Sequence, residues 1–316
     1  MHMSDALLSP PVALSAGIVS ALLIGVSASR IKHEDRDGDA PLMGVLGAFV
    51  FAAQMINFTI PGTGSSGHII GGLLLAALLG PWRGFITLCS VLIVQCLVFA
   101  DGGLLALGCN IINMAAMSCL VAYPLVFKPL LGQNLNKSRI MLASVVASVV
   151  GLELGAFMVS VETVLSGISA LPMNRFILFM LPIHLAIGIC EGIATGLVLV
   201  FVSQRAPAMM MWNVPENSAA TRKSRRSMVV IFAVAALILA VAFAWIASEN
   251  PDGLEWAIMK LTGSTELAPS ATPSTAFMPD YESHLSGIVG GIIVMMILWA
   301  VSMMIFRRKP QQKPRQ

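Results

Sequence analysis

Long apolar runs constrain the fold of this chain more than any other feature of its sequence. Hydrophobic residues make up 57% of its 316 residues and charged residues only 11%, whereas soluble domains carry roughly 25% charged residues. Because a helix needs about 20 apolar residues to cross a bilayer, the pattern predicts an all-α, polytopic membrane protein. The nine expected membrane segments are 12–30, 42–60, 67–80, 84–100, 104–127, 139–165, 176–204, 228–247 and 285–306.

The basic residues predict how these segments are oriented. With the N-terminus outside, 17 of the 19 Lys and Arg residues fall in inner connections, and only Arg175 and Lys260 stay outside. This asymmetry follows the positive-inside rule. We therefore expect a multi-pass protein in the plasma (inner) membrane of a prokaryote, with its N-terminus outside and its C-terminus in the cytoplasm. The net charge of +3 then has a topological use and does not indicate nucleic acid.

Two parts are predicted along the chain. Residues 1–205 are expected to form a seven-span helical bundle, followed by a basic cytoplasmic linker at 206–227. Residues 228–306 are expected to form a two-helix hairpin around an outer loop, 248–284, before a basic cytoplasmic tail at 307–316. Since two helices cannot enclose a transport path, we interpret the hairpin as an auxiliary module that supplies no metal ligand.

Small residues recur every four positions on several of these segments. Examples are Ala147 and Gly151 in the sixth segment, and Gly188 and Gly192 in the seventh. Small residues at this spacing let helices approach closely in lipid. The repeats predict close packing inside the bundle or, alternatively, docking of a second membrane subunit.

The chain begins Met1-His2-Met3, and a histidine at position 2 has unusual chelating power. The α-amine, the amide nitrogen of His2 and its imidazole Nδ1 can bind one metal ion through a five-membered and a six-membered ring. Three roughly coplanar nitrogen donors suit Ni(II) or Cu(II) better than Mg(II) or Ca(II). Unlike a signal peptide, this start carries Asp5 and no early Lys or Arg, so we expect the terminus to be retained. The alternative is that His2 is only a polar residue on a frayed terminus.

A loop rich in Gly and Ser supplies the candidate for a fourth donor. His68 ends the run 61–68, Pro-Gly-Thr-Gly-Ser-Ser-Gly-His, which is expected on the outer side, like the amine. A neutral imidazole can bind a metal through one nitrogen. We therefore predict a metal site formed by Met1, His2 and His68.

Other polar residues at membrane depth allow two interpretations. Such residues are costly in lipid and often functional, so they can line an ion path or orient a ligand histidine. They can equally pair with one another between helices. The candidates are Asn110, Asn113, Glu153, Glu162, His184, Glu191, Gln54 and Asn57.

Motifs for ATP hydrolysis and for a zinc protease are absent from the sequence. Neither GxxxxGK[ST] nor HExxH occurs, and the five cysteines form no CxxC pair. We therefore expect a transport subunit and not an enzyme, with no cofactor. If ATP powers transport, the ATPase must be another polypeptide.

The start of the chain, from Met1 to Pro10, resembles that of the CbiM/NikM family. These proteins are the substrate-binding (S) components of energy-coupling-factor importers for cobalt and nickel. Met3 and Ala6 replace Ile and Gly of the family pattern. The resemblance covers about 1–205 and continues through 67–72, 110–114 and 182–191. In the second part, 251–255 (Pro-Asp-Gly-Leu-Glu) and 279–281 are similar to the fused CbiN/NikN auxiliary module of NikMN-type chains.

The resemblance implies metal ligation by the Met1 amine, by the amide and imidazole nitrogen atoms of His2, and by His68. It also implies a membrane transmitter (T) subunit and cytoplasmic ABC-type ATPases as partners. The substrate would be Ni(II), with Co(II) as the alternative.

Two rival functions from other classes stay open at this point. One is a self-sufficient, proton-coupled secondary metal transporter that uses Glu153, Glu162 or Glu191 as a proton relay. The other is a membrane-embedded metallohydrolase, for which a closed site of four nitrogen donors leaves poor room for a water molecule.

Overall fold

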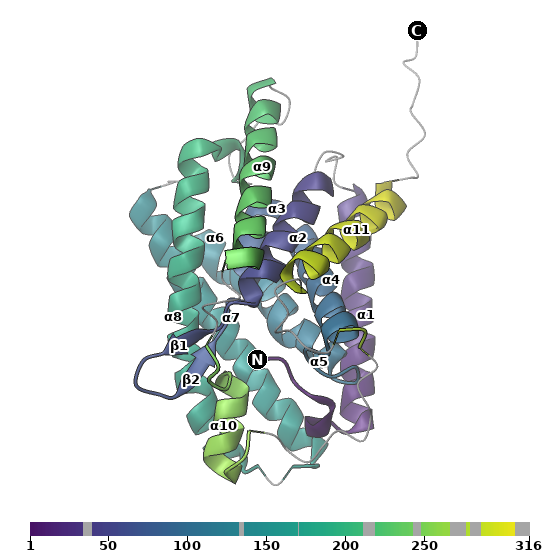
Figure 1. Ribbon diagram of the computed structural model, residues 1–316, viewed down its shortest axis with the longest axis vertical. Helices are drawn as coiled ribbons and strands as arrows, with labels where there is room; N and C mark the ends of the chain where they lie inside the picture. Colours follow the sequence, from purple (N-terminus) through teal and green to yellow (C-terminus); the bar gives the residue numbers. More distant parts are fainter. Residues whose placement is uncertain are drawn as a thin grey trace.

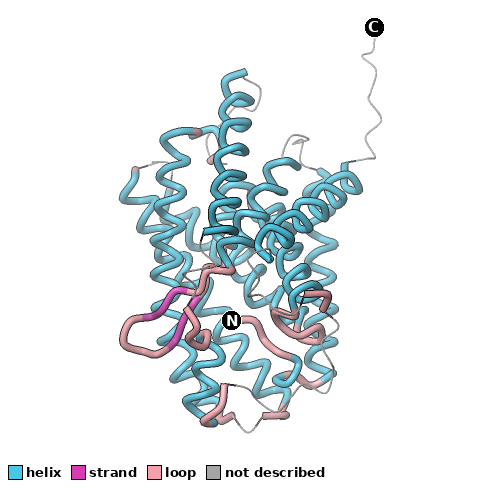
Figure 2. Tube along the Cα trace, in the orientation of Figure 1, coloured by secondary structure: helices cyan, strands magenta, loops and turns pink. Residues whose placement is uncertain are grey.

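The structure is a computed structural model that describes residues 1–33, 40–132, 136–169, 171–210, 219–242, 248–265, 276–278 and 286–306. Several sequence predictions fall outside these ranges: those on Arg36, on 211–218 of the linker, on 279–281 and on the tail 307–316. Helices dominate the described part, and the only strands in it form one short hairpin (Figure 2). This confirms the prediction of an all-α chain.

Seven helices in the described part are long and apolar enough to cross a bilayer, which confirms a multi-pass membrane protein (Figure 1). One of them is a continuous helix built from α5 (Leu107–Asn110), the π-helical η2 (Ile111–Phe127) and α6 (Lys128–Leu131). The other six are α1 (Pro10–His33), α4 (Pro81–Phe99), α7 (Lys137–Ser166), α8 (Met173–Arg205), α9 (Ala219–Ala242) and α11 (Ser286–Phe306).

Two of the predicted membrane segments are only partial spans. α2 (Ala40–Gln54) and α3 (Gly72–Leu79) have 15 and 8 residues. At 1.5 Å per residue they reach about 22 and 12 Å, less than the roughly 30 Å of a hydrocarbon core. The expectation of a helical span throughout 42–60 is therefore wrong, because the chain after Gln54 is not helical. The short segment 67–80, for which a partial or tilted span is one expectation, is a partial span.

That connection forms an antiparallel hairpin where the sequence predicted only a Gly-rich loop. β1 (Phe58–Ile60) pairs with β2 (Ser65–Gly67). The turn between them needs the positive φ values of Gly62 and Gly64, +77° and +73°, which glycine adopts without steric cost. Gly71, at φ +74°, then starts α3.

α7 and α8 pack closely through their small residues, as the four-residue repeats predicted. A Cβ added at Gly188 would lie 2.9 Å from the Cα of Val149, and Gly192 faces Val145 in the same way. Glycine therefore permits a helix contact that no larger residue fits at these positions.

The two helices of the second part, α9 and α11, contact each other where Gly287 meets Ala240, and both pack more extensively against α2. Phe232 of α9 meets Phe49 edge to face, with ring centroids 5.2 Å apart, and Leu298 of α11 lies against Gly47. The second part thus covers the short helix α2 of the first part.

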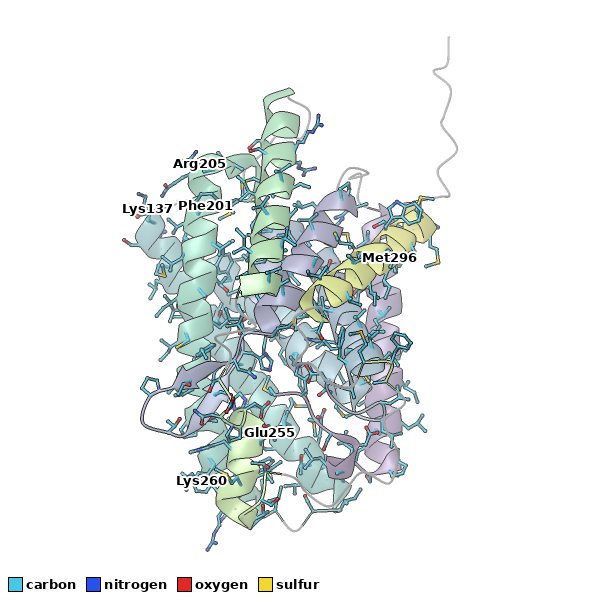
Figure 3. The ribbon with its side chains drawn as sticks, in the orientation of Figure 1. Lys137, Phe201, Arg205, Glu255, Lys260 and Met296 are labelled. Atoms are coloured by element: carbon cyan, nitrogen blue, oxygen red, sulfur yellow. The ribbon has the colours of Figure 1, made fainter. Side chains whose placement is uncertain are left out.

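The N-terminus, the β1–β2 hairpin and a further helix lie toward one end of the molecule (Figure 1). This further helix, α10 (Gly253–Thr262), lies within the expected outer loop, for which no helix was predicted. Figure 3 shows Glu255 and Lys260 of α10 near that end and Lys137 and Arg205 near the opposite one. The start of α7 and the end of α8, which were expected on the inner side, therefore lie far from the N-terminal segment.

Candidate metal site

Residues 1–8, the N-terminal segment, run into the protein instead of fraying into solvent. Met1 and Met3 are buried. The amide nitrogen of Met3 donates to Oδ1 of Asn110 (2.8 Å), and Nδ2 of Asn110 donates to the Met3 carbonyl (3.2 Å). The Met3 carbonyl also accepts from the Gly103 amide at 2.9 Å. Asn110 therefore fixes the backbone directly after His2.

Two helices, α8 and α2, hold the loop that carries His68. His68 directly follows β2, and the backbone amides of Ile70 and Gly71, two and three residues later, donate to the two carboxylate oxygens of Glu191 at 2.9 and 3.0 Å. Nε2 of Gln54 donates to the Ile70 carbonyl at 2.7 Å. A buried carboxylate that accepts two backbone amides fixes the path of the loop, so Glu191 positions the loop that carries His68.

The predicted ligand residues Met1, His2 and His68 are brought together. The Met1 nitrogen lies 3.4 Å from Nε2 of His68, and the rings of His2 and His68 have centroids 5.3 Å apart. Neighbouring nitrogen ligands about 2.0 Å from one metal at right angles are about 2.8 Å apart. The distance between the Met1 nitrogen and Nε2 of His68 is therefore only slightly longer than the distance between two neighbouring ligands of one metal ion.

Burial keeps both imidazoles in the form that binds metals. Burial, together with the smaller effect of the Met1 ammonium charge, lowers the pKa of His2 to about 3 and the pKa of His68 to about 3. Both rings are therefore neutral near pH 7, with a lone pair available for a metal ion. Within the described part of the chain, Nδ1 of His68 is buried and has no hydrogen-bond partner.

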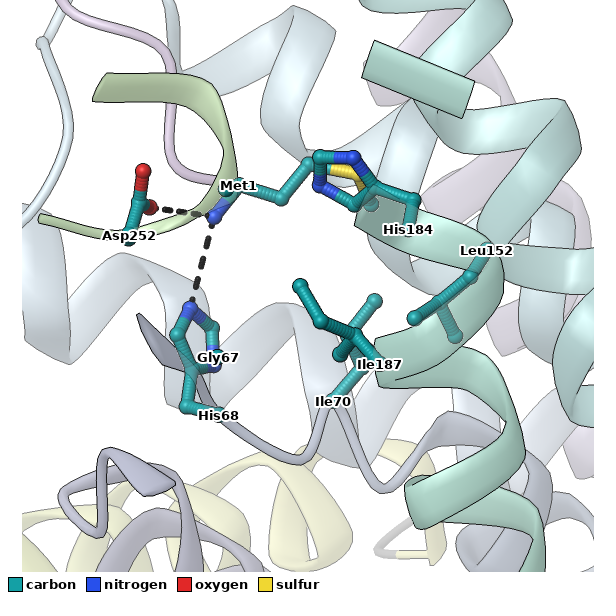
Figure 4. A pocket seen from close by; sticks show the side chains of 9 residues that line it. Met1, Gly67, His68, Ile70, Leu152, His184, Ile187 and Asp252 are labelled. Carbon is teal, nitrogen blue, oxygen red and sulfur yellow. Dashed lines mark hydrogen bonds and ion pairs between the residues drawn. The ribbon is translucent and has the colours of Figure 1, made fainter. Parts of the chain in front are cut away.

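Asp252, which no sequence argument placed here, makes the closest polar contact to the N-terminus. Its Oδ2 accepts from the Met1 ammonium at 2.7 Å, as the dashed line in Figure 4 shows. Burial alone would raise the pKa of Asp252, but the ammonium charge and its hydrogen bond hold that pKa well below its usual range. The pattern Asp252-x-x-Glu255 at the start of α10 indicates a helix N-terminus. It does not predict a contact with an amine 251 positions away.

A cavity of about 10 Å³ lies beside Met1, His68 and Asp252, whereas His2 is not among its lining residues. A space of this size holds about one water or one ion, not an organic substrate. His184 of α8 faces it across from Asp252 (Figure 4). Nδ1 of His184 pairs with the Met180 carbonyl at 2.7 Å, and its Nε2 has no partner among the described residues. The residues around the cavity are Met1, Gly67, His68, Ile70, Leu152, His184, Ile187, Asp252 and Gly253.

Two further candidates do not line this cavity. Nδ2 of Asn113 donates to Glu162 at 2.7 Å, which is the pairing between helices that was one of the two interpretations. Glu153, next to the lining residue Leu152, is not among the lining residues. Across the described residues, no three His, Cys, Asp or Glu side chains form a metal-binding cluster. A metal here would therefore depend on nitrogen atoms of the N-terminal backbone.

Family comparisons divide the chain into two matched regions. The CbiM family, described as the cobalt uptake substrate-specific transmembrane region, matches residues 2–209, and the PDGLE domain matches residues 226–307.

Similar proteins include fused and single-part relatives. A putative fused nickel transport protein NikMN of Archaeoglobus fulgidus is 30% identical over 311 residues, which cover 96% of this chain and 98% of the relative. The cobalt transport protein CbiM of Clostridium tetani is 29% identical and covers 65% of this chain and 86% of the relative. A crystal structure of a transition metal transporter is 31% identical, with a TM-score of 0.59, over 72% of this chain and 99% of that chain. The chain therefore belongs to the CbiM family of substrate-specific transmembrane proteins of metal uptake, carries a PDGLE domain, and is a transport component and not an enzyme.

Proposed function

We propose that this chain captures Ni(II) at the outer face of the membrane for uptake. The observation that carries this proposal is the meeting of the Met1 amine, His2 and His68 beside a buried cavity of single-ion size. The proposed ligands are the Met1 amine nitrogen, the amide nitrogen and Nδ1 of His2, and one imidazole nitrogen of His68. Asn110 and Glu191 position the two segments that carry them.

Nickel is preferred over cobalt for two reasons. Four nitrogen donors in one plane match the geometry that Ni(II) favours. Relatives aligned along both parts of the chain are named as nickel transport proteins, among them the fused NikMN protein of Rhodobacter capsulatus, which is 26% identical over 315 residues. Cobalt is the alternative, because the matched CbiM relatives are named for cobalt. The metal that co-purifies with untagged protein decides between the two.

The energy for uptake is proposed to come from other polypeptides. The sequence lacks a phosphate-binding loop, so ATP would be hydrolysed by separate cytoplasmic ABC-type subunits that act through a membrane transmitter subunit. The distribution of Lys and Arg supports an outer N-terminus. Uptake by the chain alone, dependent on a proton gradient and not on ATP, would instead support a secondary transporter.

Two added residues before Met1 test the proposed site. The addition turns the Met1 amine into an amide and places the histidine at position 4, out of chelate register with the new amine, so Ni(II) binding should fall by at least about 100-fold, as expected when metal ligands are lost. The measurement is Ni(II) affinity by competition with a chelator, on detergent-purified protein. The control carries the same two residues at the C-terminus. Wild-type affinity in the N-terminally extended protein would rule out the chelate.

A further inference from the structure

The carboxylate of Asp252 is held by two sets of contacts at once. Its Oδ1 accepts from the backbone amides of Leu254 and Glu255, both at 2.8 Å, and thereby caps α10. Its Oδ2 is left to accept from the Met1 ammonium at 2.7 Å. The carboxylate is therefore aimed at the amine by the helix that it caps.

The segment around Asp252 is also fastened to the hairpin that carries His68. The amide of Ser66 donates to the Pro251 carbonyl at 2.8 Å, and Oγ of Ser66 donates to the Asn250 carbonyl at 2.7 Å. Nε1 of Trp256 donates to the Thr63 carbonyl at 2.9 Å. Asp252 and His68 thus belong to one connected unit, although they come from different parts of the chain.

Formal charges show what this carboxylate does in the metal-free site. The Met1 ammonium contributes one positive charge and Asp252, 2.7 Å away, one negative charge, and His2 and His68 are counted as neutral because only a neutral imidazole has a lone pair for a metal. The sum is zero. Asp101, whose Oδ1 lies 3.6 Å from Nδ1 of His2, has a side chain that is 31% exposed, against 18% for Asp252, so water screens its charge more strongly.

The formal charges can be counted in the same way for the site with a bound divalent metal ion. The amine and the amide each lose a proton, because ligand atoms must be deprotonated to bind a metal. Two positive charges from the metal and one negative charge from the amide leave one positive charge in a buried site, which is costly without a partner. Asp252 cancels it. A coordinated amine also keeps two N–H bonds, so one can still donate to Oδ2.

We propose that Asp252 is the fixed counter-charge of the metal site: it stays beside the Met1 amine with and without metal and keeps the buried site neutral in both states. This inference rests on the proposed function, since it assumes that the metal binds the amine. It makes the PDGLE domain a functional part of the site through a charge, while the prediction that the second part supplies no metal ligand is retained.

The test compares full-length wild type with Asp252→Asn and with Glu249→Gln as the matched control. Asn caps helices as well as Asp does, so Asp252→Asn removes the charge and keeps an oxygen for α10. We expect Ni(II) affinity, measured by chelator competition, to fall about 10- to 100-fold in Asp252→Asn, as for other groups that support metal ligands. Glu249→Gln, which removes an exposed carboxylate three residues before Asp252, should bind like wild type.

The absorption spectrum of the Ni(II)-saturated protein separates a counter-charge from a ligand. At saturation Asp252→Asn should show the wild-type spectrum, because the nitrogen ligands are unchanged. If Asp252→Asn binds Ni(II) as tightly as wild type or more tightly, the proposal is overturned, because Asp252 then either has no effect on metal binding or opposes it. Weaker binding with an altered spectrum would also overturn it. If wild type itself binds no Ni(II), the proposed function fails instead. Asp252→Ser, which also keeps a capping oxygen, replaces Asp252→Asn if that variant does not fold.

Discussion

His68 and His184 both face the cavity, but their ring nitrogen atoms are engaged differently. His68 points Nε2 at the Met1 amine, while His184 uses Nδ1 on the Met180 carbonyl and stands on the far side of the cavity. The two residues should therefore differ in their importance for metal binding. An imidazole that is a ligand contributes a metal–nitrogen bond, whereas an imidazole that only lines the cavity contributes packing and polarity.

Replacing each histidine separately measures this difference. His68→Ala should weaken Ni(II) binding by at least about 100-fold, and His184→Ala by no more than about tenfold. The readout is affinity by chelator competition, with thermal stability of the metal-free proteins as the control for folding. The opposite order, with His184→Ala abolishing binding and His68→Ala leaving it intact, would reverse the assignment of the fourth donor.

The chemistry of single residues made part of the site predictable. Met1, His2 and His68 could be named because an N-terminal amine, a histidine at position 2 and a histidine in a Gly/Ser loop each have a known affinity for metals. Asn110 and Glu191 could be suspected of a functional role only because polar side chains are energetically costly at membrane depth. The backbone groups that they contact could not be predicted. Asp252 could not be found, since an acidic residue at a helix start usually only caps the helix, and its second contact exists only in the folded chain.

At the scale of elements, the β1–β2 hairpin sits tightly against α8. A Cβ added at Gly67 would lie 2.6 Å from Cγ1 and 2.8 Å from Cδ1 of Ile187, closer than packed carbon atoms tolerate. The hairpin can therefore carry His68 to the site only because residue 67 has no side chain.

Gly67→Ala should push β2 away from α8 and move His68 from the Met1 amine. We expect destabilisation of about 1–3 kcal/mol, as for other overpacked positions, with weaker Ni(II) binding. The double variant Gly67→Ala/Ile187→Ala removes the opposing side chain and should recover part of the affinity. Gly25→Ala is the control, because no atom lies within 4 Å of a Cβ there. No recovery in the double variant would show that this contact does not set the hairpin position.

The long helices were predictable from the sequence, and the short elements were not. Runs such as 139–165 and 176–204 exceed the span length, and α7 and α8 are found there. α2 and α3 were predicted too long, because apolar residues such as Phe58 and Ile60 have the same hydropathy in a strand as in a helix. Phe58 pairs with Gly67 and Ile60 with Ser65 in β2, and neither partner contributes to a periodic hydrophobic pattern.

At the scale of the whole molecule, the second part closes over the first at the outer end of the proposed site. Oγ1 of Thr59 in β1 and Oγ of Ser248 lie 2.8 Å apart, and the contacts from Asn250 to Trp256 continue along the hairpin. Because Met1 and His68 lie next to these contacts, we expect the exchange of a bound metal ion to require movement of the segment 248–256.

A disulfide between these two positions tests this closure. In the double variant Thr59→Cys/Ser248→Cys, the oxidised form should exchange Ni(II) at least about tenfold more slowly than the reduced form, with similar equilibrium affinity, because the cross-link blocks movement and changes no ligand. The measurement is release of bound Ni(II) to excess chelator. The single-Cys variants are the controls. Unchanged exchange after oxidation would show that metal ions take another route.

The ion pair between Met1 and Asp252 also has a consequence for the order in which the protein is made. The two residues are 251 positions apart, which corresponds to roughly 10 to 50 s of translation at about 5–20 residues per second. During that interval the nascent chain holds the amine and both histidines but not the acidic residue that pairs with the amine. If Asp252 is the counter-charge of the site, we expect an unfinished chain to capture metal weakly, and tight binding to arise once the PDGLE segment has been synthesised.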